Sequence, residues 1–523
     1  MITTTLEISR IRSVRSSVFP PAVPVALLSL LLAPMARAEF KFQPTVGLRQ
    51  TYTDNAGLSR DEDARSRFIT QVSPGFSLLN NSARLTLRAD YALNYYATNG
   101  DGDDTRTTRS QLRAAARATL LDELLFFDGS ASISQQAISA FGPQVNDNDY
   151  VRTNRADVKT LRLSPSLRHQ FGNTALLQAR YAHETVDSGR ALFGRSSTDT
   201  VSMNLSSGRS FGRIGWGLNL SEQQLSEARF GDSSVRSASA NLSYMMVGGF
   251  SLTGVAGYDE YDYQSLGGPT KGKFWNLGFN WAPSARTSLS ASAGRRFFGD
   301  SYSLRGLHRS RRSVWNISYD DTVSNARGQS VIPAGTDTAA TIDRLLTAQF
   351  PDPLLRAQVV DAFIRANNLP PTLADNLHYL SNRYSLYRQL RASAGFNTAR
   401  TTFILSGFGS RREALSEPLE GSPAIDLGGL TLNDNVRQRG ASAMFSMRLA
   451  GRSTLNVSLS NSHTTSESVR GREASNTALR VAMTRRFSQR ANASVELHTA
   501  KGSTSQLHEY RENAVSAALS LTF

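Results

Sequence analysis

The sequence predicts an all-β protein, a transmembrane antiparallel outer-membrane β-barrel of about 22 strands (roughly 18–26) with a small helical loop insert. Three observations predict this fold. Short segments in which apolar and polar residues alternate recur from residue 40 to the end of the chain. The connections between these segments are alternately short and long. The N-terminus has the layout of a secretory signal peptide, and the chain contains no cysteine.

Residues 1–38 are predicted to form a signal peptide. A segment with three arginines precedes an apolar run from Val18 to Leu32, and Ala36-Arg37-Ala38 matches an A-x-A cleavage site. The apolar run is shorter than the roughly 20 residues that a membrane-spanning helix needs. We therefore expect the mature chain, residues 39–523, to be exported to the outer membrane of a Gram-negative cell and to form the barrel.

The composition is too polar for a large dry core. Hydrophobic residues make up 40% of the 523 residues, and the formal net charge is +15. A barrel suits this composition because half of each strand faces lipid and the other half faces water. No later segment approaches about 18 consecutive apolar residues, so no transmembrane helix is expected. An exported protein has little access to nucleic acid, and no nucleic-acid partner is expected.

Individual segments show the period of two that a half-buried strand requires. In FWNLGFNWA (274–282) Trp275, Leu277, Phe279 and Trp281 share one face. The final segment, ENAVSAALSLTF, alternates in the same way and ends on an aromatic residue. Such an ending resembles the last strand of bacterial outer-membrane barrels. The resemblance implies that the barrel-assembly machinery recognises Leu519, Leu521 and Phe523.

One segment breaks this rhythm. Between two alternating runs, residues 322–383 contain apolar residues at helical spacing, and Asp352 followed by Pro353 suits the start of a second helix. We interpret 322–383 as a helical insert. It is either a decorated extracellular loop or a plug or gate in the lumen.

The first strands carry short motifs in a fixed order. YTDN is followed by an acidic loop, then by SPGF, a turn and a strand that contains DY. This order resembles the opening of the outer-membrane barrels associated with the PEP-CTERM/exosortase system, a family that occurs with exopolysaccharide genes. The resemblance implies a barrel and an exopolysaccharide context, without a mechanism. The motif residues are Tyr52, Thr53, Asp54, Asn55, Ser73, Pro74, Gly75, Asp90 and Tyr91.

A physical interpretation of the motifs stands beside this resemblance. Asp54 and Asn55 favour turns and should end the first strand where the chain leaves the membrane. Pro74-Gly75 should bend the second strand or introduce a bulge. A divalent cation could bind between Asp54 and the acidic residues 61–63, but a solvated loop is the favoured interpretation. We expect no metal and no cofactor.

The polar face of the strands should line the lumen. Arginine keeps its charge and presents a planar fork to carboxylate or phosphate groups. A basic lumen would concentrate anionic solutes. The alternative is that arginines face water by default and pair locally. The inward acids assigned by alternation are Asp90, Glu184 and Glu496. The inward arginines are Arg84, Arg88, Arg113, Arg117, Arg162, Arg168, Arg180, Arg391, Arg448, Arg480 and Arg486.

Three functions compete, and none of them is enzymatic, because the seven histidines lie on separate segments and no catalytic motif is present. The first is a porin-like conduit for export of an anionic exopolysaccharide or related surface polymer. The second is a structural or attachment barrel that holds surface polymer. The third is a gated uptake receptor, which would need an N-terminal plug before the first strand. The expected partners are the lipid bilayer, lipopolysaccharide, the barrel-assembly machinery, anionic polysaccharide and periplasmic export proteins.

Overall fold

The structure is a computed structural model. It describes residues 40–100, 105–143, 154–188, 194–227, 231–263, 269–324, 384–416, 435–469, 471–504 and 508–523, together with Leu266 and several residues between 325 and 383. The predicted signal peptide, residues 1–38, lies outside these residues. Within the described part of the chain, no helix is long and apolar enough to cross a bilayer.

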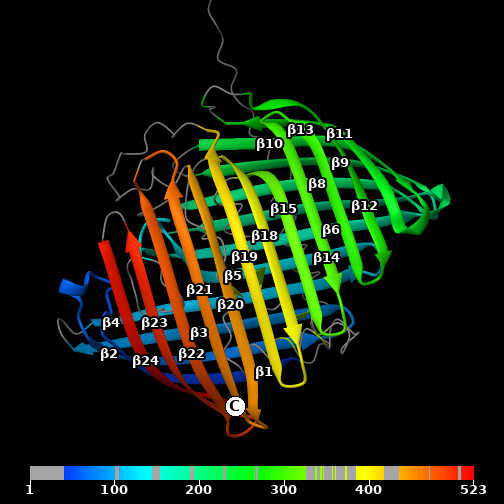
Figure 1. The fold of residues 1–523 in the computed structure, drawn as a ribbon. Coiled ribbons are helices and arrows are strands. Elements are labelled where there is room, and N and C mark those ends of the chain that lie inside the picture. Colours follow the sequence, from blue (N-terminus) through cyan, green and yellow to red (C-terminus); the bar gives the residue numbers. More distant parts are fainter. Residues whose placement is uncertain are drawn as a thin grey trace, which may run out of the picture.

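Twenty-two strands form one antiparallel sheet, in which consecutive strands pair and β1 also pairs with β24. This last pairing closes the sheet into a barrel (Figure 1), which leaves no free edge. The fold class and the predicted number of about 22 strands are therefore confirmed.

The first eleven strands are β1 (Lys41–Thr53), β2 (Arg67–Asn81), β3 (Leu85–Gly100), β4 (Thr105–Leu121), β5 (Leu125–Ala137), β6 (Arg155–Phe171), β7 (Ala175–Asp187), β8 (Arg195–Ser207), β9 (Ile214–Glu227), β10 (Gly231–Met245) and β11 (Phe250–Asp262). The other eleven are β12 (Lys271–Ser284), β13 (Thr287–Arg296), β14 (Gly299–Arg309), β15 (Ser313–Ser324), β18 (Ser385–Asn397), β19 (Thr401–Ala414), β20 (Val436–Ala450), β21 (Ser453–Ser466), β22 (Glu473–Arg486), β23 (Ala491–Thr504) and β24 (His508–Thr522). Three 3₁₀ turns also occur in the described part of the chain, η1 (Asp61–Asp63), η2 (Arg209–Phe211) and η3 (Val247–Gly249).

The two ends of the barrel differ. At one end, which we call the turn rim, ten connections of two to six residues join the strands, and β1 begins and β24 ends there. The other end, the loop rim, carries all the connections longer than six residues, together with five shorter ones, β3–β4, β9–β10, β13–β14, β21–β22 and β23–β24. In outer-membrane barrels the short turns and both termini face the periplasm. The turn rim is therefore the periplasmic end.

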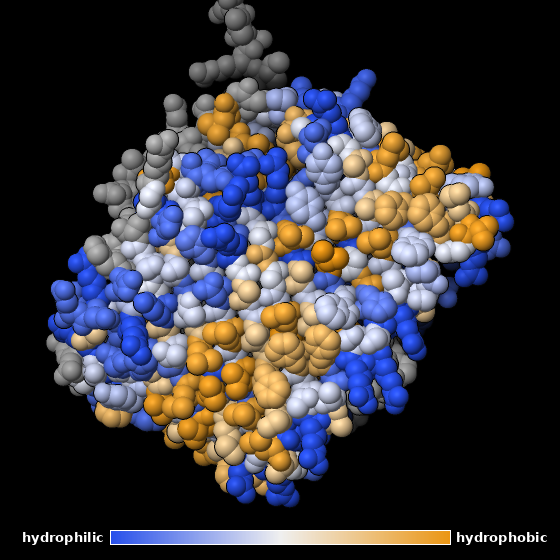
Figure 2. All heavy atoms as spheres, viewed as in Figure 1, coloured by the Kyte–Doolittle hydropathy of each residue, from blue (hydrophilic) through white to orange (hydrophobic). Residues whose placement is uncertain are grey.

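The outer face is apolar over the half of the barrel nearest the turn rim. Leu277 is 64% exposed, Leu242 59% and Leu497 54%. Figure 2 shows hydrophobic side chains gathered toward the turn rim of the front wall, with hydrophilic residues above them. The opposite face carries buried polar residues such as Ser406 and Ser442, whose hydroxyl oxygens are 2.6 Å apart. The apolar residues thus face outward and the polar ones line the interior, as a membrane barrel requires.

The YTDN motif ties the first strand to the last. β1 ends at Thr53, as the sequence predicts, and the Asp54 carboxylate accepts hydrogen bonds from the backbone N–H and the side-chain amide of Asn513, both at 2.7 Å. The Thr53 hydroxyl donates to the fully buried Glu512 carboxylate at 2.8 Å. The Asn55 amide donates to the backbone carbonyl of Arg511 at 3.0 Å. The motif therefore fastens β1 to β24. We call the β1–β24 pairing that closes the barrel the seam, and the contacts of Thr53, Asp54 and Asn55 with β24 the clasp.

The sequence predicts either a bulge or a bend at Pro74-Gly75, and the structure shows that the predicted bulge is wrong. The pairings Val72↔Tyr95 and Gly75↔Ala92 keep one register on both sides of the site, so no extra residue is inserted. Proline lacks the N–H that a ladder needs, and two ladder positions are skipped there. Gly75 is required for another reason, because a Cβ at this position would lie 2.4 Å from the carbonyl oxygen of Tyr91.

Most of the predicted insert, 322–383, lies outside the described residues. β15 continues to Ser324, so the first residues of that range belong to a strand. The described residues Ile342, Asp343, Leu346, Arg356 and Val360 are helical, and Arg356 Nε lies 2.8 Å from Asp343 Oδ1. A short pairing joins β16 (Thr336–Asp337) to β17 (Thr372–Leu373). The choice between an outer loop and a plug stays a prediction.

Candidate functional site

The candidate site is the lumen with its two rims. Residues directly opposite each other in an antiparallel sheet project from the same face. By this register ten of the eleven predicted arginines lie on the inner face; for example, Arg113 is opposite Asp90 and Arg162 is opposite Glu184. The exception is Arg84, which lies in the β2–β3 turn and pairs with Asp122 of the next turn at 2.8 Å. Contact of these arginines with an anionic solute stays a prediction.

Several inner-face arginines pair with carboxylates. Arg88 Nε lies 2.7 Å from Asp90 Oδ2, and Arg480 Nε lies 3.0 Å from Glu496 Oε1. The predicted inward acids Asp90 and Glu496 thus take part in ion pairs. In this part of the lumen the arginines therefore pair with nearby carboxylates, as the alternative to a role in anion binding predicts.

Asp128 is an inward acid that the alternation pattern did not indicate. Its carboxylate accepts a hydrogen bond from Arg117 at 2.8 Å and forms an ion pair with Arg180 at 3.5 Å. The segment around it, LFFDGS, has apolar residues at adjacent positions, so alternation alone does not say which residues face inward. Only the pairing of Asp128 with Arg117 across β4 and β5 settles its side of the wall.

The turn rim is strongly basic. Its ten turns, all within the described residues, contain two acidic residues, Asp122 and Glu123, against nine arginines. All nine are exposed, and the exposed inner-face residues Arg168, Arg448 and Arg486 lie within three positions of the strand ends at the same rim. The nine arginines are Arg84, Arg209, Arg213, Arg286, Arg311, Arg312, Arg400, Arg452 and Arg490.

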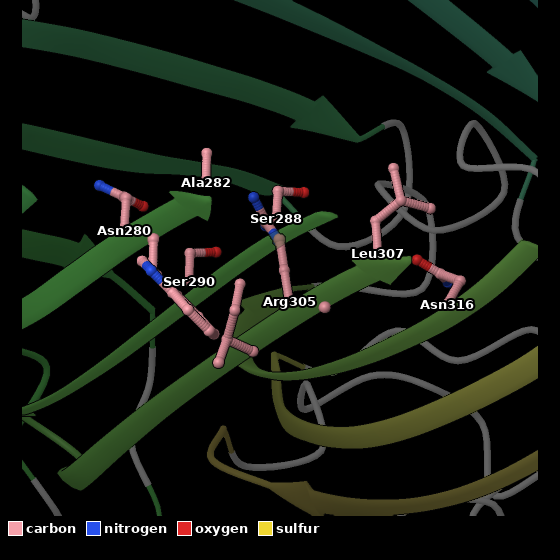
Figure 3. Close-up of a pocket in the computed structure, with 10 residues that line it drawn as sticks. Asn280, Ala282, Ser288, Ser290, Arg305, Leu307 and Asn316 are labelled. Carbon is pink, nitrogen blue, oxygen red and sulfur yellow. The ribbon is translucent and has the colours of Figure 1, made fainter. Parts of the chain in front are cut away.

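A recess in the inner wall adds another cation near this rim. Figure 3 shows Asn280, Ser288, Ser290, Arg305 and Asn316 projecting from neighbouring strands of β12–β15 around it. The alternation pattern does not indicate the side of Arg305, because SLRGLHR has leucines on both faces of the strand. The register settles the matter, because Arg305 is opposite Ser290 and Ser318. The side chain of Arg305 is exposed to the lumen.

At the loop rim, the β5–β6 connection reaches across the opening. Ala140 and Phe141 are fully buried against Val436 of β20 and Ala474 of β22, which are inner-face residues seven or more strands away around the barrel. The guanidinium of Arg472 lies 5.2 Å from the centre of the Phe141 ring. Burial lowers the pKa of the Arg472 guanidinium.

Asn154 fixes the base of this connection. Its side-chain oxygen accepts the N–H of Ser139 at 2.7 Å, and its amide donates to the carbonyls of Ser139 at 2.9 Å and of Pro143 at 3.2 Å. Asn154 has a positive φ of 58°, a conformation that asparagine tolerates. The segment around Phe141 is therefore held in place from both sides of the loop.

A second contact crosses the loop rim elsewhere. Tyr384, which precedes β18, lies with its hydroxyl 3.0 Å from that of Ser233 on β10 and stacks on Tyr263 at 4.8 Å. Burial raises the pKa of Tyr263 to about 12, so its hydroxyl stays protonated at neutral pH. The backbone N–H of Leu266 donates to the carbonyl of Leu415 at 3.1 Å. These contacts cross the opening of the barrel at the loop rim, at a different place from the contacts of Phe141.

The acidic residues of the loop after β1 lie in two different settings. Asp54 is engaged with Asn513, whereas residues 61–63 form the exposed turn η1. Over the residues that the structure describes, no group of three or more histidine, aspartate or glutamate side chains is placed to hold a metal ion.

No family model and no curated protein matches the sequence. Among solved structures, the FrpB iron transporter of Neisseria meningitidis is 12% identical, with a TM-score of 0.48 over 92% of this chain and 82% of that one. The siderophore receptor PirA of Pseudomonas aeruginosa is 9% identical, with a TM-score of 0.40 over 93% and 81%. The outer membrane protein OpdK of Pseudomonas aeruginosa is 10% identical, with a TM-score of 0.36 over 92% and 99%.

Proposed function

We propose that this outer-membrane barrel is a conduit for the export of an anionic exopolysaccharide or related surface polymer. One observation carries the proposal, the excess of exposed arginine over acidic residues at the turn rim. A positive rim raises the local concentration of a polyanion and speeds its capture. Because this rim faces the periplasm, the charge stands where an exported polymer would enter.

The inner wall continues this charge into the barrel. Arg113, Arg168 and Arg448 face inward, are exposed, and have no ion pair within the described part of the chain. They can bind carboxylate or phosphate groups on a passing polymer without giving up an existing partner. Any periplasmic protein that delivers the polymer would dock on the same rim.

The proposal predicts an anion-selective current in a planar lipid bilayer. Changing Arg113, Arg168 and Arg448 to glutamate should shift the reversal potential in a salt gradient toward cation selectivity, because a ring of charge selects the opposite sign. Lys273→Glu reverses a charge on the outer face of β12 and should leave selectivity unchanged. Equal selectivity of the triple variant and the native protein would refute a basic conduit.

The contacts across the loop rim favour a second candidate, an attachment barrel that holds surface polymer without conducting it. Phe141 and Tyr384 both join walls that are far apart around the barrel. A barrel that gives no current, yet retains polymer on the cell surface, would support this second function. A deletion strain distinguishes the two, because loss of secretion indicates a conduit and release of secreted polymer into the medium indicates attachment.

A further inference from the structure

The outer face of the barrel carries a row of arginines near the loop rim. Arg388 on β18 is directly opposite Arg411 on β19, which is directly opposite Arg437 on β20. They share the outer face with Leu390 and Leu405, which expose 44% and 47% of their side chains. Like charges directly opposite each other destabilise a sheet, so this row needs compensating negative charge.

Two glutamates supply part of that charge. Glu413 lies 3.0 Å from Arg411 and 3.2 Å from Arg388. Glu467 lies 2.8 Å from Arg411 and 3.5 Å from Arg437. These pairs hold Arg411 between two carboxylates.

The compensation is incomplete at the β20 end of the row. Arg439 lies two residues from Arg437 on the same face, is exposed, faces His463, and has no ion pair within the described residues. At the other end, Asp321 is opposite Arg388 and accepts the backbone N–H of Tyr302 at 3.0 Å. The surplus positive charge therefore lies at Arg437 and Arg439.

The position of this row along the strands can be compared with the height of the apolar band that faces the membrane. Eight residues along β19 separate Arg411 from Phe403, whose ring stacks with Phe396 at 6.3 Å near the turn rim. At about 3.4 Å per residue and a strand tilt of roughly 40°, the arginines stand about 20 Å above these aromatics. The apolar band of such barrels is about 25 Å tall. The arginines thus lie within a few ångströms of the upper edge of this band, close enough for their long side chains to reach the polar groups of the outer leaflet.

The wall directly below the row is smooth. On β19 the outward positions between Leu405 and Arg411 are Gly407 and Gly409. A Cβ on Gly409 would meet no atom within 4 Å, and one on Gly407 would meet only the carbonyl oxygen of Gly440 at 3.8 Å. A strip without side chains lets an acyl chain lie against the sheet beneath a bound head group.

We propose that this patch binds the phosphate group of a phosphorylated lipid of the outer leaflet. Arg437 and Arg439 contact the phosphate, Arg411 is held behind them by Glu413 and Glu467, and an acyl chain lies over the glycine strip. Arginine suits this ligand because its planar fork donates two hydrogen bonds to phosphate oxygens. In Figure 2 hydrophilic side chains gather on the upper left of the visible wall, above a hydrophobic region. The lipid site is independent of what the lumen conducts.

The test uses the full mature chain, refolded in detergent without bacterial lipid. Three probes are titrated and binding is measured by native mass spectrometry: bisphosphorylated lipid A, the same lipid after phosphatase treatment, and inorganic phosphate. We expect the Arg437→Gln/Arg439→Gln variant and the phosphatase treatment each to weaken lipid binding about tenfold, which corresponds to about 1.4 kcal/mol. The matched control is Arg236→Gln, an outer-face arginine of β10 that pairs with Glu222 at 3.1 Å.

Three results would overturn the proposal. The first is undiminished binding of the dephosphorylated lipid. The second is lipid binding by the double variant that is as tight as that by the Arg236→Gln control. The third is binding of inorganic phosphate as tight as that of the lipid, which would assign the site to a free anion. If the double variant does not fold, as judged by heat-modifiable mobility on a gel, Arg439→Gln carries the test. That substitution removes no ion pair within the described part of the chain, and it should still weaken lipid binding.

Discussion

Gly75 belongs to a set of inner-wall glycines whose missing side chain makes room for the backbone of the next strand. A Cβ on Gly75 would lie 2.4 Å from the carbonyl oxygen of Tyr91, and one on Gly257 would lie 2.4 Å from that of Ala238. A flexible side chain could turn away from such a contact, but a carbonyl in a hydrogen-bonded ladder cannot. Glycine is therefore required at these positions by close approach of the strands.

Gly75→Ala should lower the free energy of unfolding by about 1–3 kcal/mol, because the added methyl group forces the two strands apart. Urea unfolding in detergent micelles, followed by tryptophan fluorescence, measures the change. The matched control is Gly409→Ala, a strand glycine with no heavy atom within 4 Å of the added carbon. It should change stability by less than about 0.5 kcal/mol. Equal effects of the two substitutions would contradict this account of Gly75.

At the scale of elements, the seam between β1 and β24 determines whether the sheet is a barrel. It pairs Thr45 to Thr53 with Ala514 to Thr522, and the clasp formed by Thr53, Asp54 and Asn55 stands at its end near the loop rim. Each hydrogen bond of this kind adds about 1 kcal/mol, and those to a carboxylate add more. The YTDN motif thus secures the one pairing that chain connectivity does not enforce.

The seam predicts a specific cross-link. Thr51 and Ser516 are directly opposite and face inward, so cysteines at both positions should form a disulfide in the folded barrel. The natural chain contains no cysteine, so no other thiol competes. Electrophoresis without reductant detects the closed loop as a shift in mobility. Cysteines at Thr51 and Ala518, which lie on the same face but two residues out of register, should cross-link much less. A better yield from this second pair would show that the register is different.

At the scale of the whole molecule, the two rims differ in their charge and in the contacts that cross them. The turn rim holds exposed arginines and is suited to collecting anions. Contacts of Phe141 and Tyr384 cross the loop rim and join parts of the wall that are six or more strands apart. A polymer that entered at the turn rim would meet these contacts last.

Phe141→Ala should raise the single-channel conductance, because the ring anchors the β5–β6 connection to Val436 and Ala474. Truncating a buried phenylalanine costs about 3–5 kcal/mol, enough to free this part of the loop from the opposite wall while Asn154 still holds its base. Current through single barrels in a planar bilayer measures the effect. Phe211→Ala, at an exposed position of the turn rim, is the control and should leave the conductance unchanged. An unchanged conductance of Phe141→Ala would mean that the loop does not limit the pore.

Much of the wall could be predicted from sequence because alternation reports which face a residue takes. It placed ten of the eleven arginines on the inner face, and it indicated the number of strands. It failed where apolar residues occupy both faces, as around Asp128 and Arg305. It also did not show the charge of the turn rim, because that charge is spread over turns far apart in the chain.

The sequence by itself determined that the chain folds as a membrane barrel, since a period of two and alternating connection lengths are local properties of the chain. Only the tertiary structure decided what meets across the barrel. The clasp of Asp54 on Asn513, the insertion of Phe141 beside Val436 and the row from Arg388 to Arg437 join residues from separate strands or loops. The physical reason is that closure of a sheet brings residues together through strand register and sheet curvature. Both depend on the pairing of several strands, so no single segment of the sequence determines them.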